Sequence, residues 1–126
     1  MSDRFEQGMK VRRRVLGDAH VDRAEAVKSD FDAPFQAMIT EGAWGTVWAS
    51  DALTDRERSL VTLALLAGLG NLEELALHVR ATANTGASPE DVREALMHVA
   101  VYAGVPRANR ALAVAKSVYA EMGMEP

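Results

Sequence analysis

Apolar residues recur every three or four positions along the second half of the chain, which is the spacing of one face of an α-helix. In residues 72–85 the apolar face consists of Leu72, Leu75, Ala76, Val79 and Ala83. A polar stripe on the same segment contains Glu74 and His78, which are four residues apart and therefore neighbours on a helix surface. The pattern predicts an amphipathic helix whose polar stripe carries two ionisable groups.

Helix-start signals divide this half of the chain into four segments. The sequences TDRE, NLEE and SPED, which begin at Thr54, Asn71 and Ser88, each place a capping residue three positions before an acid. Pro89 and Pro106 suit the first turn of a helix. The glycines that stand where helices would end are Gly70, Gly86, Gly104 and Gly123. We therefore predict helices at about 55–69, 72–85, 89–103 and 106–122.

Upstream, the segments DRFEQGMKVRRRVL and HVDRAEAVKSDFDAPFQAMIT predict two or three more helices. The segment EGAWGTVWASDAL, residues 41–53, is expected to be a connection that holds both tryptophans. No segment alternates between apolar and polar residues as a half-buried strand would. The predicted fold class is all-α, a single-domain helical bundle over residues 1–126.

The segment SLVTLALLAGLG, within the predicted helix 55–69, is apolar on almost every side. A surface helix of a soluble protein usually shows one apolar stripe. One core in a chain of 126 residues can hardly cover such a helix completely. We therefore expect burial against a neighbouring subunit, and hence a homo-oligomer.

Charge and composition exclude several classes of protein. The chain has 18 acidic and 14 basic residues and a formal net charge of −4, which argues against nucleic-acid binding, including a helix-turn-helix around TGASPED. The run KVRRR is most simply a solvated face, or alternatively lends an arginine to an anionic ligand. The absence of cysteine excludes disulfides and thiol chemistry, and no apolar run is long enough to span a membrane. We expect a cytoplasmic protein.

Two interpretations of Glu74 and His78 stay open at this stage. Glu74 either completes a capping box with Asn71 beside a hydrogen-bonded histidine, or forms a proton-handling site with His78. No metal site is expected, because cysteine and paired-histidine spacings are absent. Trp44 and Trp48 are four residues apart, so they would share a face if their segment were helical.

Taken together, the stretches RRRVLGDAHVDRA, AWGTVW, RERSLVTLALLAGLG, LEELALHVRATANTG and EALMHVAVYAGVPRAN resemble the carboxymuconolactone decarboxylase family over nearly the whole chain. This family shares its all-α fold with the alkylhydroperoxidase D-like proteins, whose motif is C-x-x-C-x-x-x-H. Aligning the motif histidine with His78 places the two cysteines at Asn71 and Glu74 and the upstream glutamate near Ser59. Peroxidase chemistry by that route is excluded, because the chain has no nucleophilic sulfur.

The resemblance implies a cofactor-independent decarboxylation of 4-carboxymuconolactone, a dianionic lactone, to 3-oxoadipate enol-lactone in aromatic catabolism. It also implies a ring-like hexamer. On this hypothesis His78 donates the proton, supported by Glu74, and Arg58 grips a substrate carboxylate with its fork of donors. The remaining substrate-binding candidates, for a hydrogen bond and for excluding water, are Ser59, Trp44 and Trp48.

Two alternatives remain. One is a decarboxylase or isomerase of a different lactone or β-keto acid on the same scaffold. The other is a non-catalytic helical oligomer that binds an acidic ligand. A second polar stripe, formed by Glu94, His98 and Tyr102, either lines a polar pocket or is a solvated edge; the edge or a packing role is favoured for Glu94, and His98 stays open.

Overall fold

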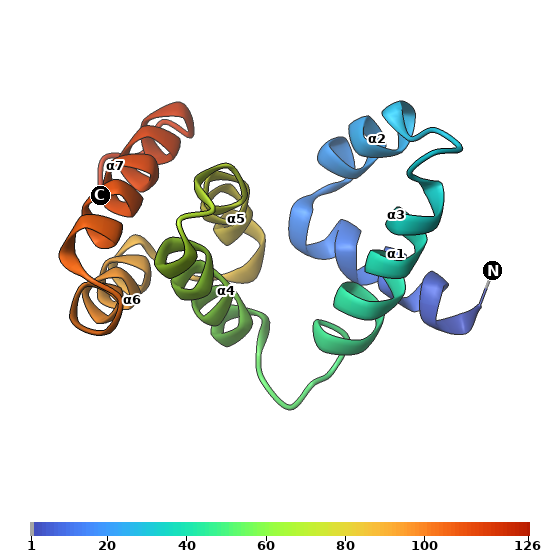
Figure 1. Ribbon diagram of the computed structural model, residues 1–126, viewed down its shortest axis with the longest axis horizontal. Coiled ribbons are helices and arrows are strands. Elements are labelled where there is room, and N and C mark those ends of the chain that lie inside the picture. The colour runs from blue at the N-terminus through green and yellow to red at the C-terminus, as the bar shows by residue number, and fades with distance from the viewer. Residues whose placement is uncertain (1) are drawn as a thin grey trace. The chain divides into compact units, whose positions relative to one another are not determined.

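The computed structural model describes residues 2–126, and within them the regular elements are all helices, which confirms the all-α prediction. Contacts divide the chain into two compact units, one that ends at Thr54 and one that spans Asp55–Pro126. Figure 1 colours the chain from blue at the N-terminus to red at the C-terminus, so the helices of each unit can be followed along the chain. The single domain over residues 1–126 stays a prediction.

The first unit contains four helices, α1 (Asp3–Leu16), α2 (Asp18–Val27), α3 (Ala33–Ile39) and the π-helix η1 (Thr40–Val47). Helix α1 begins at a capped end, because the backbone N–H of its third residue donates to the hydroxyl of Ser2 at 3.1 Å. It ends at a glycine with φ of 90°, after which α2 begins.

The backbones of α1 and η1 approach each other closely at two glycines. A Cβ atom added to Gly8 would overlap the carbonyl oxygen of Thr40, and one added to Gly45 would overlap the carbonyl oxygen of Arg4. The two helices therefore touch through their main chains, which only glycine permits at these positions. This contact is the main packing interface of the first unit.

The prediction of a connecting segment at residues 41–53 is wrong for its first half, which lies in η1. In a π-helix each N–H bonds the carbonyl five residues earlier, and Trp48 N–H donates to Ala43 in this way at 2.9 Å. The Thr46 hydroxyl also donates to the carbonyl of Glu41, five residues earlier, at 3.0 Å. Of the two glycines in these eight residues, Gly45 allows close packing against α1, whereas Gly42 has open space where a Cβ would lie.

The interpretation of KVRRR as a solvated run is wrong at Arg12, which is only 7% exposed. Its guanidinium donates to Glu25 on α2 at 3.2 Å, and the same carboxylate accepts from Lys28 at 2.7 Å. These contacts, the Lys28 hydrogen bond foremost, hold the pKa of Glu25 below its usual value. Arg12 lies on the face of α1 that also buries Val11 and Val15, so helical spacing brings it into contact with α2.

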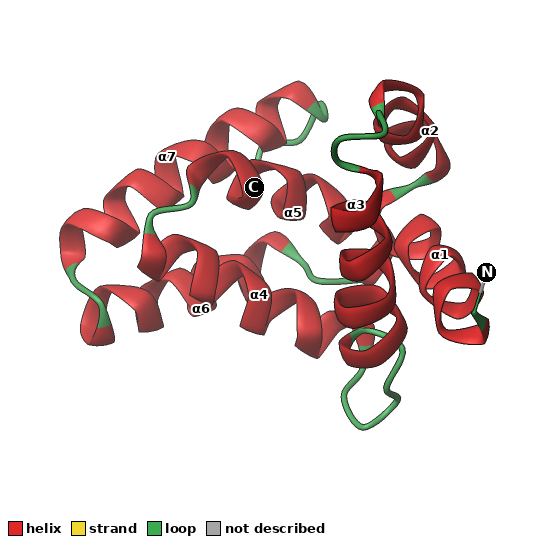
Figure 2. Ribbon diagram, turned by 45° about the vertical axis from the view of Figure 1, so that its right-hand side comes forward, coloured by secondary structure: helices red, strands yellow, loops and turns green. Residues whose placement is uncertain are grey.

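The second unit consists of α4 (Asp55–Leu69), α5 (Leu72–Thr85), α6 (Pro89–Tyr102) and α7 (Val105–Glu121). These bounds confirm the predicted helices to within one residue at each end. Helices α4 and α7 each pack against both α5 and α6 (Figure 2). The side chains at the centre of their shared core include Leu63, Leu75, Val79, Leu96 and Ala111.

Two helix ends in this unit follow the predicted signals, and a third does not. Ser88 forms the capping box with Asp91: its hydroxyl accepts from the Asp91 N–H at 3.0 Å, and the Asp91 carboxylate accepts from the Ser88 N–H at 2.9 Å. Gly86 closes α5 in the left-handed conformation. The capping box predicted at Asn71 and Glu74 is wrong, because the Asn71 side chain caps nothing. Asn71 has ψ of 75° rather than the extended value that aims a capping side chain at the helix.

Candidate active site

One face of α5 buries three polar side chains in an otherwise apolar environment. His78 is 7% exposed, and Thr82 and Thr85, four and seven residues further on, are buried beside it. The Thr82 hydroxyl donates to the carbonyl of Val79 at 2.6 Å. A buried imidazole on such a face can exchange a proton in surroundings of low polarity, where each charge interaction is stronger than in water.

A fourth buried polar side chain, Ser59, comes from α4. It is 1% exposed, and its hydroxyl has no hydrogen-bond partner among the described residues. The chain reverses between α4 and α5 at Gly70, so the start of α4 lies at the same end of this hairpin as Thr82 and Thr85. A buried hydroxyl without a partner costs about 1–3 kcal/mol, so this position favours a bound polar group.

Arg58 precedes Ser59 on α4 and is half-buried. Consecutive residues of a helix point about 100° apart, so the two side chains leave α4 in different directions. Arg58 is therefore adjacent to Ser59 in sequence, but its side chain leaves α4 from a neighbouring face of the helix.

Glu74 lies in the first turn of α5 and is exposed. His78, one turn further along α5, is buried instead. The structure therefore brings His78 together with the buried threonines of α5 and leaves Glu74 at the solvent-exposed end of the helix.

Trp44 and Trp48 belong to the first unit, where both are buried, with 6% and 7% exposed. Their ring centroids are 5.3 Å apart with the planes tilted by 33°, so the predicted common face is confirmed. Trp44 lies in η1 and Trp48 directly follows it.

The second polar stripe is an exposed feature of α6. His98 and Tyr102 stack with centroids 5.3 Å apart, and they line a cavity together with Leu65 and Leu69 of α4. Tyr102 is 81% exposed. Within residues 2–126 there is no group of three or more His, Asp or Glu side chains placed to hold a metal ion. The helices formed by these residues are also too short or too polar to cross a membrane.

An ion pair between helix starts was missed by the sequence analysis. The Arg56 guanidinium on α4 donates through Nε to the Asp91 carboxylate on α6 at 2.8 Å and makes a second bond through its terminal nitrogen. The bond from Arg56 is the largest cause of an Asp91 pKa well below the usual range. The sequence indicated only a capping role for Asp91, because Arg56 lies 35 positions earlier in the chain.

Comparison with known proteins places this chain among decarboxylases. Residues 33–117, which contain every candidate site residue, match the model of the carboxymuconolactone decarboxylase family. The chain is 41% identical over 123 residues to 4-carboxymuconolactone decarboxylase of Acinetobacter baylyi, which covers 98% of this chain and 92% of the relative. It is 42% identical over 118 residues to nitrosuccinic acid decarboxylase of Metarhizium robertsii, with 94% and 82% covered. A 42-residue match to 4-carboxymuconolactone decarboxylase of Pseudomonas putida is 57% identical and covers 33% of this chain and 88% of the relative.

Proposed function

This chain belongs to the carboxymuconolactone decarboxylase family, and we propose that it converts 4-carboxymuconolactone to 3-oxoadipate enol-lactone and CO2 without a cofactor. The observation that carries the proposal is the 41% identity to a 4-carboxymuconolactone decarboxylase over 98% of the chain. The buried His78, which lies within the matched segment, supplies a group suited to the chemistry.

The reaction requires little from the protein beyond binding and one proton. The bond between the γ-carbon and its carboxylate breaks, and its electron pair passes through the ring double bond onto the lactone carbonyl, which becomes a dienolate. Protonation of the carbon next to that carbonyl then gives the enol-lactone. The conjugated lactone itself accepts the electrons, so the protein must hold two carboxylates, stabilise the developing oxyanion and deliver a proton.

His78 is the proton donor in this proposal. An unperturbed imidazole has a pKa of about 6.5, so it gives and regains a proton near neutrality. Glu74 lies one turn earlier on the same helix and is assigned a supporting role beside His78. The burial of His78 supports the role, because a proton donor shielded from water acts on substrate rather than on solvent.

Arg58 and Ser59 are proposed to bind the substrate. The arginine fork suits a bidentate grip on one carboxylate. The Ser59 hydroxyl is buried and without a partner in the described residues, so a substrate oxygen would satisfy it. Trp44 and Trp48 are proposed to exclude water, because they form an adjacent pair of buried apolar rings.

The test is the rate of loss of 4-carboxymuconolactone absorbance, with a metal chelator present, for wild type, His78→Gln and the matched control His20→Gln in the first unit. We expect kcat of His78→Gln to fall by about 10²–10⁴-fold, the usual contribution of a positioned general acid, and the control to keep its rate. Wild-type rates in His78→Gln would move the proton donor elsewhere, with His98 the next candidate. If the wild type does not turn over the lactone, the proposed substrate is wrong and only the family fold remains.

A second candidate substrate follows from the comparable identity to a nitrosuccinic acid decarboxylase. In that acid, too, CO2 can leave from a carbon whose electrons pass into an adjacent acceptor, the nitro group. The ratio of kcat/KM for the two acids decides between them, since that ratio measures discrimination at the transition state. A higher kcat/KM for nitrosuccinate would make that acid, rather than the lactone, the proposed substrate. Stabilisation by either acid without turnover would instead favour a non-catalytic binding protein.

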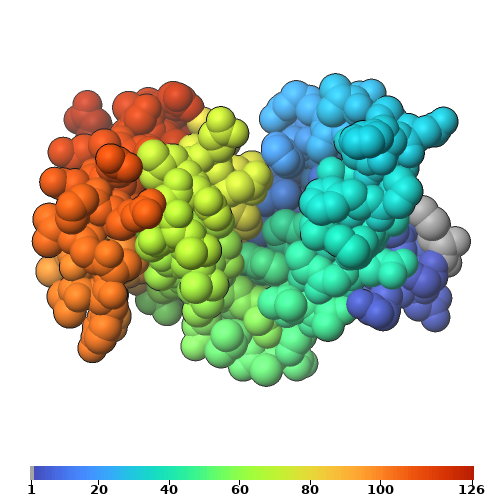
Figure 3. Space-filling model, viewed as in Figure 1, coloured from blue at the N-terminus to red at the C-terminus, as the bar shows by residue number. Residues whose placement is uncertain are grey.

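The enzyme is proposed to be a homo-oligomer, with a hexamer as the specific expectation. Three apolar residues at four-residue spacing along α4, Val61, Leu65 and Leu69, are 52%, 59% and 67% exposed. Figure 3 shows the side chains of α4 at the surface of the second unit. Apolar side chains in a row at this exposure support burial against a second copy of the chain.

A further inference from the structure

A cavity between α6 and α7 lies outside the residues proposed for decarboxylation. Its volume is about 430 Å³, which is within the range of small-molecule sites. Pro89 at the start of α6 and Pro126 at the end of the chain border it. His78, Ser59 and Arg58 are not among the residues that line it.

The wall of the cavity is apolar and belongs to the core of the second unit. It is formed by Val92 on α6 and by Leu112 and Ala115 on α7. Val92 is 2% exposed and Ala115 is 4% exposed, so the packed helices hold the wall in place. Such a surface suits a compact apolar body rather than an extended polar one.

One polar group stands in this wall, the hydroxyl of Tyr119. The residue is 4% exposed, and its oxygen meets no hydrogen-bond partner in the described part of the chain. The Thr82 hydroxyl is near enough to lower the pKa of Tyr119, but the Tyr119 oxygen has no partner in hydrogen-bonding geometry, and Thr82 donates its own proton to Val79. Burial raises the pKa of Tyr119, so the phenol keeps its proton and acts as a donor.

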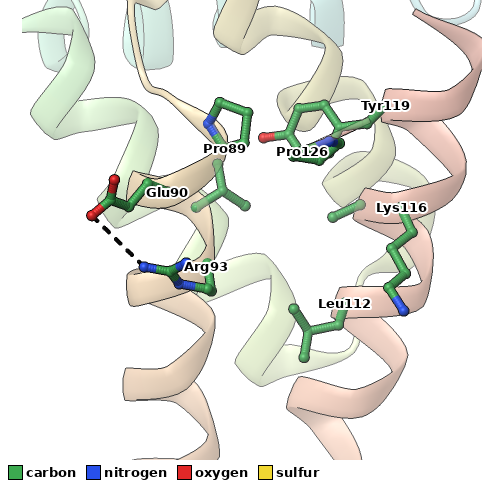
Figure 4. Close-up of a pocket in the computed structure, with 9 residues that line it drawn as sticks. Pro89, Glu90, Arg93, Leu112, Lys116, Tyr119 and Pro126 are labelled. Carbon is green, nitrogen blue, oxygen red and sulfur yellow. Dashed lines mark ion pairs between the residues drawn. The ribbon is translucent and has the colours of Figure 1, made fainter. Parts of the chain in front are cut away.

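Two cations lie at the opening. Figure 4 shows Arg93 on α6 and Lys116 on α7 on opposite sides of the cavity, with the Tyr119 hydroxyl at the end near Pro89. Lys116 forms no ion pair among residues 2–126. Arg93 has loose, exposed contacts, at 3.7 Å to Glu90 and 3.4 Å to Glu94. The opening therefore offers positive charge that an anion can engage.

We propose that this cavity binds a compact apolar monocarboxylate that carries a second oxygen as a hydrogen-bond acceptor. The carboxylate lies between Lys116 and Arg93, the apolar body lies against Leu112, and the second oxygen accepts from Tyr119. Glu90 at the same opening repels a second negative charge, so the ligand is a monoanion rather than the dianion proposed for the decarboxylation.

The probe is 4-oxocyclohexanecarboxylate, whose ketone accepts but cannot donate a hydrogen bond. Titration of the full chain followed by amide chemical shifts would give the site and the Kd. We expect saturable shifts in α6 and α7. Cyclohexanecarboxylate, which lacks the ketone, should bind about fivefold more weakly, the usual effect of one hydrogen bond. The neutral 4-oxocyclohexanecarboxamide should also bind more weakly.

Three variants assign these preferences to residues. Tyr119→Phe should abolish the preference for the ketone and leave the preference for the carboxylate. Lys116→Gln should abolish the preference for the carboxylate and leave the preference for the ketone. Leu112→Trp should fill the cavity and remove saturable binding, and its melting temperature would show whether it folds. The proposal is wrong if the probe does not saturate, if the shifts fall outside α6 and α7, or if Tyr119→Phe keeps the ketone preference.

Discussion

At the scale of single residues, buried polar atoms without a hydrogen-bond partner indicate where a ligand or a water binds. Ser59 on α4 and Tyr119 on α7 both carry buried hydroxyls without a hydrogen-bond partner in the described residues. Proteins rarely leave such groups unpaired, so each hydroxyl that remains unpaired favours a ligand or a water as its partner. The two residues occur in different settings, one in the proposed active site and one in the cavity between α6 and α7.

Ser59→Ala separates a binding role from a structural one. Removing an unpaired buried hydroxyl should leave the melting temperature unchanged or slightly higher, because no internal hydrogen bond is lost. The same change should lower kcat/KM for 4-carboxymuconolactone about tenfold, since a substrate oxygen loses its donor. Thermal unfolding and initial rates check both expectations. A destabilised variant with normal kcat/KM would contradict the proposed role.

The Arg56–Asp91 pair makes the stability of the second unit depend on pH. The folded-state pKa of Asp91 lies below its ordinary value of 3.8, so the unfolded chain takes up a proton first as the pH falls. The stabilisation is therefore fully present above about pH 5, and it is lost as the pH falls through the ordinary pKa toward the folded-state pKa.

Urea unfolding of wild type and Asp91→Asn between pH 2 and pH 7 measures this effect. The midpoint difference should be constant near neutrality and should shrink in acid. Asp30→Asn is the matched control, because Asp30 is exposed and forms no ion pair within residues 2–126. A difference for Asp91→Asn that is the same at every pH would show that the ion pair does not contribute through ionisation.

At the scale of elements, η1 is held by its contact with α1. Gly45 has the carbonyl of Arg4 where a Cβ would lie, whereas Gly42 on the same helix has nothing within 4 Å. Helical propensity favours alanine over glycine at both positions by about 1 kcal/mol. The packing of α1 on η1, rather than propensity, therefore decides which glycine is required.

Gly45→Ala should lower the free energy of unfolding by about 1–3 kcal/mol, because a backbone oxygen cannot move aside as a flexible side chain can. Gly42→Ala is the matched control and should be neutral or slightly stabilising. Chemical denaturation followed by tryptophan fluorescence reports on both, since Trp44 and Trp48 lie in or directly after η1. Equal effects of the two substitutions would contradict the close α1–η1 contact.

At the scale of the whole molecule, the exposed apolar row on α4 predicts self-association. Leu65→Lys places a charge in the middle of this row and should convert the proposed hexamer into smaller species. The matched control is Val27→Lys on α2, which is 80% exposed and lies in the other unit. Sedimentation equilibrium measures the mass of each. A monomeric wild type, or a Leu65→Lys variant of unchanged mass, would contradict assembly through α4.

The sequence alone specified the four helices of the second unit, because their determinants are local. Capping residues, prolines and glycines act within a few positions, and Ser88 with Asp91 forms the box that their spacing indicates. The spacing of His78 from the apolar residues of α5 also placed it on a helix. Local pattern did not indicate how far each polar group would be buried, so the difference between buried His78 and exposed Glu74 appeared only in the fold.

Only the tertiary structure decided the features that depend on distant residues. The pairs Arg12–Glu25 and Arg56–Asp91 join different helices, and no local pattern in either segment specifies its partner. The π-helix η1 exists beside α1 because two glycines let the main chains touch, a contact whose two sides are more than 30 residues apart. The cavity between α6 and α7 likewise arises from packing. Helix boundaries follow from short-range hydrogen bonding, whereas burial, ion pairing and cavities follow from which surfaces meet.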